Sequence, residues 1–206
     1  KVNLLDSKGN PTETNVAMSF HDVNSGNTRY TYMHTMNAQG NPDTIYLDGL
    51  SQYKLKVHTV PPVYLDSINI IEGKLNIIEV PAPQGTLLVD VKGDNPDDSN
   101  IKCIIRETGL PSTIHTIDAD KKQKLLVGLY DLEILTLRRT YINAVKIEQS
   151  KLKKVSIEEP ATIVINFRTP AIGTLLHEKG DILTDIYEFS PENSHYKLRL
   201  QPGYYR

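Results

Sequence analysis

The sequence LLDSKGN at residues 4–10 returns as LVDVKGD at residues 88–94 and as LLHEKGD at residues 175–181. In each copy an apolar run leads into Lys-Gly followed by Asn or Asp. Because Gly, Asn and Asp tolerate a positive φ, the pattern predicts a strand that ends in a tight turn. The leading leucines are 84 and 87 residues apart, which indicates an internal repeat.

A second block follows the first in each copy. It reads LDGLSQYKLKV at residues 47–57 and LVGLYDLEI at residues 126–134, and residues 198–205 (LRLQPGYY) match its opening. The parts YKLKV and YDLEI alternate apolar and charged residues, so we expect strands with one face buried and the other in water. On this reading Glu133 falls on the polar face of its strand.

The composition favours an all-β protein. The 206 residues include 20 Ile, 13 Val and 17 Thr against only 7 Ala, with 12 Gly and 12 Pro between the apolar runs. β-branched residues pack well on a pleated sheet, whereas helices favour Ala. Short strands with frequent turn signals predict a sandwich or a barrel, and a repeat of about 85 residues fits a sandwich of about seven strands.

Two blocks repeated in the same order predict three domains. Residues 1–83 form the first repeat, residues 84–170 the second, and residues 171–206 a third that is cut short. The predicted boundaries contain prolines, in PAP at residues 81–83 and TPA at residues 169–171. Proline fixes φ and cannot donate to a sheet, which suits a short, stiff connector.

The pattern L-x-x-G-x-Y-x-[LV]-x-[VI] resembles the prealbumin-like sandwiches, which include carboxypeptidase regulatory-like and Cna B-type repeats. Residues 198–205 carry the closest match. Tandem arrays of this kind are similar to those of Bacteroidota cell-envelope proteins, some with a von Willebrand A-type domain. The resemblance implies tandem seven-stranded Greek-key sandwiches of the immunoglobulin or prealbumin type. It also implies a non-enzymatic spacer or docking role in the cell envelope, in the periplasm, at the cell surface or in secreted form. The implied partners are other envelope or secreted proteins in a larger assembly.

Charge and hydropathy exclude several other classes. The formal net charge is −2 and 23% of residues are charged, which argues against a nucleic-acid binder. The chain has no long uncharged apolar run, so we expect no membrane-spanning segment. The single cysteine, Cys103, excludes a disulfide framework within the chain, and its apolar neighbours predict a buried thiol.

No cofactor and no metal are expected. The six histidines lack the close spacing that zinc sites favour. The acidic loop GDNPDDSN at residues 93–100 offers a weak calcium candidate in Asp94, Asp97 and Asp98, because calcium binds oxygen ligands. The loop lacks the alternating acidic spacing of an EF-hand, so a solvated turn is the favoured interpretation.

The resemblance to Cna B-type domains also implies a candidate isopeptide bond. Some members join a lysine to an asparagine, assisted by a buried acid, and the matching residues here are Lys92, Glu133 and Asn166. Two observations argue against the bond. Lys92 sits in an apparent turn, and Glu133 lies on a polar strand face, whereas the chemistry needs an apolar pocket that lowers the lysine pKa.

Glycan binding is the remaining alternative. Tyr30 and Tyr32 share one strand face and could stack on a sugar, although cross-strand packing explains such a pair equally well. The chain has no Trp and 3 Phe, so aromatic platforms are scarce. We therefore predict non-catalytic structural or docking repeats, with a glycan-binding module and an isopeptide-stabilised adhesin or pilin domain as alternatives.

Overall fold

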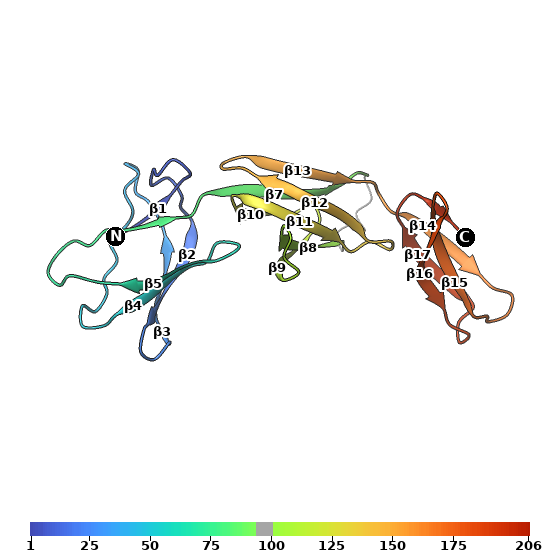
Figure 1. The fold of residues 1–206 in the computed structure, drawn as a ribbon, viewed down its shortest axis with the longest axis horizontal. Coiled ribbons are helices and arrows are strands. Elements are labelled where there is room, and N and C mark those ends of the chain that lie inside the picture. The colour runs from blue at the N-terminus through green and yellow to red at the C-terminus, as the bar shows by residue number, and fades with distance from the viewer. Residues whose placement is uncertain (94–100) are drawn as a thin grey trace. The chain divides into compact units, whose positions relative to one another are not determined.

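The computed structural model describes residues 1–93 and 101–206 (Figure 1). This part of the chain contains 18 β-strands and no helix, which confirms the all-β class. Consistent with that, no described residue belongs to a helix that could cross a membrane. The chain divides into two compact units. Unit 1 comprises residues 1–87, 123–129 and 146–153, and unit 2 comprises residues 88–122, 130–145 and 154–206.

The first strand set lies in unit 1 and forms two sheets. A four-stranded antiparallel sheet has the order β3-β2-β4-β5, and β1 pairs in parallel with β6. The bounds are β1 Val2–Leu5, β2 Val16–Asp22, β3 Thr28–His34, β4 Tyr53–Val57, β5 Val63–Ile68 and β6 Ile78–Pro81.

The core of unit 1 confirms the alternation expected for YKLKV. Tyr53, Leu55 and Val57 are buried, whereas Lys54 is exposed and Lys56 half-buried. Across the same sheet β2 contributes further buried apolar residues, and β1 and β6 contribute to the same cluster. One side of each strand therefore holds the core, as the two-residue period of a strand requires.

The second strand set forms sheets of order β10-β7-β13 and β12-β11-β8-β9, and its residues are divided between the two units. Strands β8 and β9 form an antiparallel hairpin, and β11 pairs with the other edge of β8. The bounds are β7 Gln84–Val91, β8 Lys102–Glu107, β9 Thr113–Asp118, β10 Lys122–Leu126, β11 Gly128–Ile134, β12 Thr140–Ile147 and β13 Leu152–Ile157.

The third strand set lies in unit 2. Its sheets have the orders β14-β17 and β16-β15-β18. A cluster of Leu175, Phe189, Tyr196, Leu198 and Leu200 forms its core. The bounds are β14 Ala161–Asn166, β15 Gly173–Lys179, β16 Ile182–Phe189, β17 His195–Leu200 and β18 Tyr204–Tyr205.

The strand pairing relates the second and third sets in an unexpected way. Strand β14 pairs with β17 as β7 pairs with β10, and β15 lies between β16 and β18 as β8 lies between β9 and β11. The third copy of the Lys-Gly motif is therefore in a hairpin strand, β15, whereas the first two copies are in or directly after β1 and β7. A boundary at residues 169–171 separates β14 from the strand with which it pairs. The domain limits and the tandem Greek-key arrangement stay predictions.

Candidate functional site

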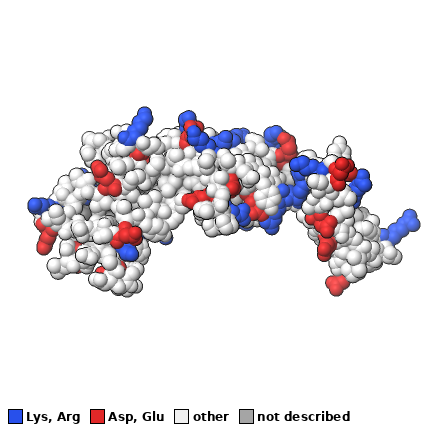
Figure 2. Space-filling view, viewed as in Figure 1, with Lys and Arg blue, Asp and Glu red and all other residues white. Residues whose placement is uncertain are grey.

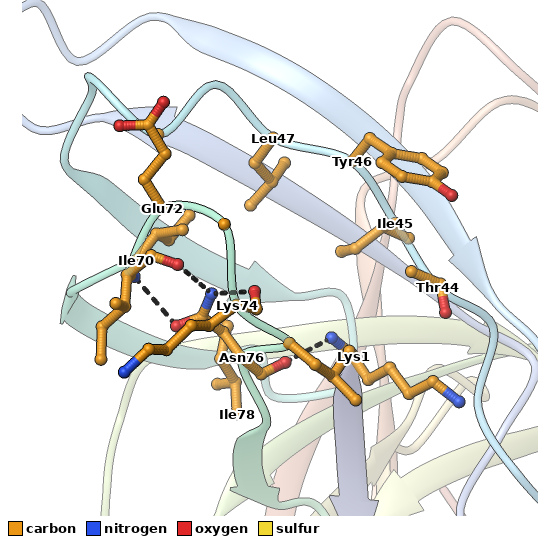
Figure 3. Close-up of a pocket in the computed structure, with 14 residues that line it drawn as sticks. Lys1, Thr44, Ile45, Tyr46, Leu47, Ile70, Glu72, Lys74, Asn76 and Ile78 are labelled. Carbon is orange, nitrogen blue, oxygen red and sulfur yellow. Dashed lines mark hydrogen bonds between the residues drawn. The ribbon is translucent and has the colours of Figure 1, made fainter.

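Unit 1 contains a mainly apolar groove with a volume of about 410 Å³ (Figure 3). Two loops face each other across it, one from residues 44–49 and the other from residues 70–76, and Ile78 of β6 adds to the wall. We call this hollow the docking groove. Its lining residues are Lys1, Thr44, Ile45, Tyr46, Leu47, Gly49, Ile70, Ile71, Glu72, Gly73, Lys74, Leu75, Asn76 and Ile78.

Large apolar side chains of the two loops are exposed to solvent. The exposed fractions are 83% for Tyr46, 58% for Ile71 and 63% for Leu75. Leu50 and Ile77, adjacent in sequence to lining residues, are 90% and 60% exposed. Single exposed apolar residues are common, whereas a group of them around a hollow is typical of surfaces that contact another molecule.

The groove floor rests on the core of unit 1. Ile45, Leu47, Ile70 and Ile78 are half-buried and pack against the buried cluster. The floor is therefore fixed by the sheets, while the rim is free to contact another molecule. A mainly apolar hollow with a few polar groups in its lining is typical of sites that accept an apolar side chain.

Asn76 closes the 71–76 loop with its side chain. The Asn76 Nδ2 group donates to the carbonyl oxygens of Ile71 (3.0 Å) and Lys74 (3.1 Å), and its Oδ1 accepts from the Ile71 N–H (3.0 Å). Gly73 adopts φ 69°, a conformation that other residues disfavour. The loop is thus an ordered turn that presents Ile71 and Leu75, because its polar backbone groups are bonded within it.

Tyrosine hydroxyls hold the opposite loop. The Tyr32 hydroxyl donates to the Tyr46 carbonyl oxygen (3.0 Å), and the Tyr53 hydroxyl donates to the Asp48 carbonyl oxygen (3.1 Å). Asp48 also accepts from the Leu50 N–H (3.0 Å). The Tyr53 ring is buried and the Tyr32 ring is half-buried against the core, and each hydroxyl fixes a loop, so the groove is largely preformed.

The docking groove is a feature of the first strand set. Residues 69–77 connect β5 to β6, whereas only residues 148–151 connect β12 to β13. The longer connection carries Ile70, Ile71, Leu75 and Ile77. Loops placed on a rigid scaffold carry binding functions in many folds, and this loop adds apolar surface that the sheets do not require.

Charge contributes little at the groove. Lys1, Glu72 and Lys74 lie on its lining and have mixed signs. Over the visible face of the molecule, Lys and Arg are mixed with Asp and Glu (Figure 2). Mixed charge gives no long-range attraction for a highly charged ligand, so apolar contact would supply the binding energy.

The calcium candidates Asp94, Asp97 and Asp98 lie outside the described residues. Within the described ranges 1–93 and 101–206, no group of three or more His, Cys, Asp and Glu side chains is arranged to hold a metal ion.

The structure does not bring the isopeptide candidates together through their polar contacts. The Lys92 ammonium pairs with the Glu158 carboxylate at 2.5 Å, and Asn166 Oδ1 is 2.5 Å from His195 Nδ1. Glu133 pairs with two arginines instead. The isopeptide bond stays a prediction without a contact among its three residues.

Glu133 is the polar residue whose environment differs most from the expectation. It points away from the buried Leu132, as the alternation predicts, yet it is only 5% exposed because arginines cover it. The Arg106 guanidinium lies 2.7 Å from one carboxylate oxygen, and the Arg139 guanidinium bonds the other. These hydrogen bonds, first from Arg139 and then from Arg106, hold the pKa of Glu133 below its ordinary value.

Tyr30 and Tyr32, the glycan candidates, pack against the core of unit 1. Their rings stack on each other with centroids 6.1 Å apart and an angle of 16° between planes. Both also contact core aromatics edge to face, Tyr30 against Tyr53 and Tyr32 against Phe20. The rings therefore serve cross-strand packing, and the structure gives no separate observation in favour of sugar stacking.

Cys103 is fully buried, as its sequence context predicts. Desolvation raises the pKa of its thiol to about 12, and the nearby Glu133 charge acts in the same direction. A thiol in this state is protonated at neutral pH, so it packs as a small apolar group.

Comparisons with known proteins leave the family open. No family model matches the chain, and no curated protein matches it. Three solved chains match, including one titled "The Bacillus anthracis TIE protein". That match has 14% sequence identity and a TM-score of 0.26, and it covers 99% of this chain and 43% of the other. A similarity this weak carries no argument about fold or function.

Proposed function

We propose that the chain is a non-catalytic array of tandem Greek-key, prealbumin-like sandwiches that docks a partner protein through the docking groove. The observation that carries this proposal is the exposure of Tyr46, Ile71 and Leu75 around a preformed apolar hollow. Complete burial of one such side chain stabilises a complex by about 1.5–3 kcal/mol. Two or three anchors in one hollow are enough for a specific contact.

The sandwich arrangement is supported by the repeated pairing of the strands. Each of the first two sets contains a four-stranded sheet and a smaller sheet, and the five strands of the third set repeat three of the strand pairings of the second set. For the second domain boundary, the pairing of β14 with β17 favours a place near Pro160. A bacterial cell-envelope or secreted location, and partners from the same compartment, follow from the family resemblance of the sequence.

Peptide selection tests the groove. We expect peptides selected from a random displayed library on the immobilised chain to be rich in aliphatic and aromatic residues. The double change Ile71→Asp and Leu75→Asp should weaken their binding about tenfold or more, because a loss of 1.4 kcal/mol corresponds to a factor of ten. Both side chains are more than half exposed, so the fold should tolerate the change.

The matched control places two aspartates at exposed apolar positions of unit 2, Ile172→Asp and Ile182→Asp. The selected peptides should bind this variant as well as the unchanged chain. Equal binding to the groove variant would contradict the proposal, since the peptides would then recognise another surface.

A further inference from the structure

The groove loop of residues 44–49 ends in a reactive sequence, Asp48-Gly49. It is the single Asp-Gly pair of the 206 residues, and the chain has no Asn-Gly pair. In an Asp-Gly pair the glycine nitrogen can attack the side-chain carboxyl carbon of the aspartate, because glycine has no Cβ to hinder the approach. Asp48 is exposed, and Gly49 belongs to the lining of the docking groove.

The Asp48 carboxyl group is turned toward the backbone that follows it. Its Oδ1 accepts a hydrogen bond from the Leu50 N–H at 3.0 Å. The ring that this bond closes contains the Gly49 nitrogen, so the nitrogen and Cγ of Asp48 are held together in one compact turn. The bond also withdraws electron density from Cγ, which favours attack at that carbon.

The attacking nitrogen is unbonded, and its peptide group is polarised. Within residues 1–93 and 101–206, the Gly49 N–H donates to no acceptor. The Tyr53 hydroxyl donates to the Asp48 carbonyl oxygen at 3.1 Å, and this carbonyl shares its peptide group with the Gly49 nitrogen. A donor at the peptide oxygen stabilises the negative charge that develops as the N–H proton leaves, so Tyr53 assists the attack.

Asp6 shows the opposite arrangement in the same unit. Its two carboxylate oxygens accept hydrogen bonds from three residues that follow it. The N–H of the next residue, Ser7, donates to Gln149 Oε1 at 2.6 Å. The nitrogen that would attack is therefore engaged, and we expect no reaction at Asp6.

We propose that Asp48-Gly49 is a self-modification site, which closes to a succinimide and then opens to an isoaspartyl linkage. The Gly49 nitrogen bonds to Cγ of Asp48, while the N–H hydrogen and the carboxyl OH leave together as one water molecule. A second water molecule then opens the ring at either carbonyl. One opening restores aspartate, and the other yields a backbone that runs through Cβ and Cγ.

The isoaspartyl form would reshape the docking groove. Its backbone contains one extra carbon before Gly49 and leaves the α-carboxylate of residue 48 as a charged side group. Gly49 lies close to the facing loop, since a Cβ built on it would be 3.5 Å from Cβ of Glu72. A longer backbone at this contact would displace one wall of the groove from the other. The reaction itself does not depend on whether the groove docks a partner.

Ageing of the purified chain tests the site. The unchanged chain and the variants Tyr53→Phe and Gly49→Ala are kept in weakly acidic buffer and sampled over several weeks. Trypsin then releases residues 30–54, and electron-transfer fragmentation distinguishes isoaspartate from aspartate at each position. Isoaspartate should accumulate at position 48 and not at Asp43 of the same peptide, because a β-branched threonine follows Asp43.

The two variants separate the fold from the local sequence. Tyr53→Phe should slow the accumulation about fivefold, because one hydrogen bond is lost while the buried ring remains. In urea, where this bond is absent, the variant should react as fast as the unchanged chain. Gly49→Ala should slow the reaction in both conditions. Gly49 does not adopt a positive φ, and the added methyl group makes only an ordinary contact with Glu72, so the fold should tolerate it.

Three results would overturn the inference. One is the absence of isoaspartate at position 48 of the folded chain, and another is an equal rate in the folded Tyr53→Phe variant. The third is a slower Tyr53→Phe rate that persists in urea, because the hydroxyl would then not act through the folded loop. Protected β2 and β4 amides show that both variants are folded during the measurement.

Discussion

The change Phe20→Ala is expected to lower the free energy of unfolding of unit 1 by about 3–5 kcal/mol. Phe20 lies on β2, a central strand of the four-stranded sheet, and is fully buried. Its ring meets Tyr32 and Tyr53 edge to face, with centroids 6.1 and 6.3 Å away. Truncation removes apolar burial and leaves a cavity that these anchored rings cannot fill, since their hydroxyls are bonded to the groove loops.

Hydrogen exchange of the β2 and β4 amides in increasing denaturant measures this loss within unit 1. The control is Tyr64→Ala on β5 of the same sheet, where the side chain is 59% exposed and lies beside Lys56. Its loss should cost about 1 kcal/mol or less. Similar losses in the two variants would show that Phe20 does not hold the core.

The change Glu133→Ala is expected to destabilise unit 2 by about 2 kcal/mol. Removing one partner of a buried ion pair costs roughly 3–5 kcal/mol because the other charge loses its partner. The side chains of Arg106 and Arg139 are 24% and 56% exposed, so water takes over part of the lost interaction. Urea unfolding followed through the amides of β8 and β11 measures the effect.

Lowering the pH should remove the stabilisation that Glu133 provides in the unchanged protein. The folded pKa of Glu133 lies below its ordinary value of 4.5, so its stabilisation is present above pH 4.5 and is lost as pH falls through the folded pKa. The Glu133→Gln variant lacks this titration. Its stability should therefore decline less over that range than the stability of the unchanged protein.

The exposed ion pairs of Glu148 provide the control for both experiments. Its side chain is 45% exposed and lies 3.2 Å from the Lys151 ammonium. Glu148→Gln should change stability by less than about 1 kcal/mol, because water screens such a pair. A Glu133 variant no less stable than this control would contradict the assigned role of the two arginines.

Burial along a strand could be predicted where it depends only on the local sequence. Alternation in YKLKV predicts the burial of Tyr53, Leu55 and Val57, because the side chains of a strand alternate between faces whatever the strand pairs with. The apolar neighbours of Cys103 likewise predict its burial.

What the sequence could not show depends on contacts between distant segments. The motif at residues 175–181 repeats the letters of the first two copies but occupies a hairpin strand, since strand identity is set by pairing. Glu133 becomes buried because two arginines cover it. Arg106 lies on β8, which pairs with β11, and Arg139 lies in the connection that follows β11. The docking groove joins residues 44–49 to residues 70–78, two segments that the structure brings together across the groove.

Photo-crosslinking in cells that produce the full-length protein tests most directly whether the docking groove binds a partner. A benzophenone amino acid replaces either Tyr46 on the groove or Tyr141 on β12, with exposed fractions of 83% and 63%. We predict one discrete protein adduct from position 46 and none from position 141. No adduct at position 46, or the same adducts from both positions, would contradict a docking role for the groove.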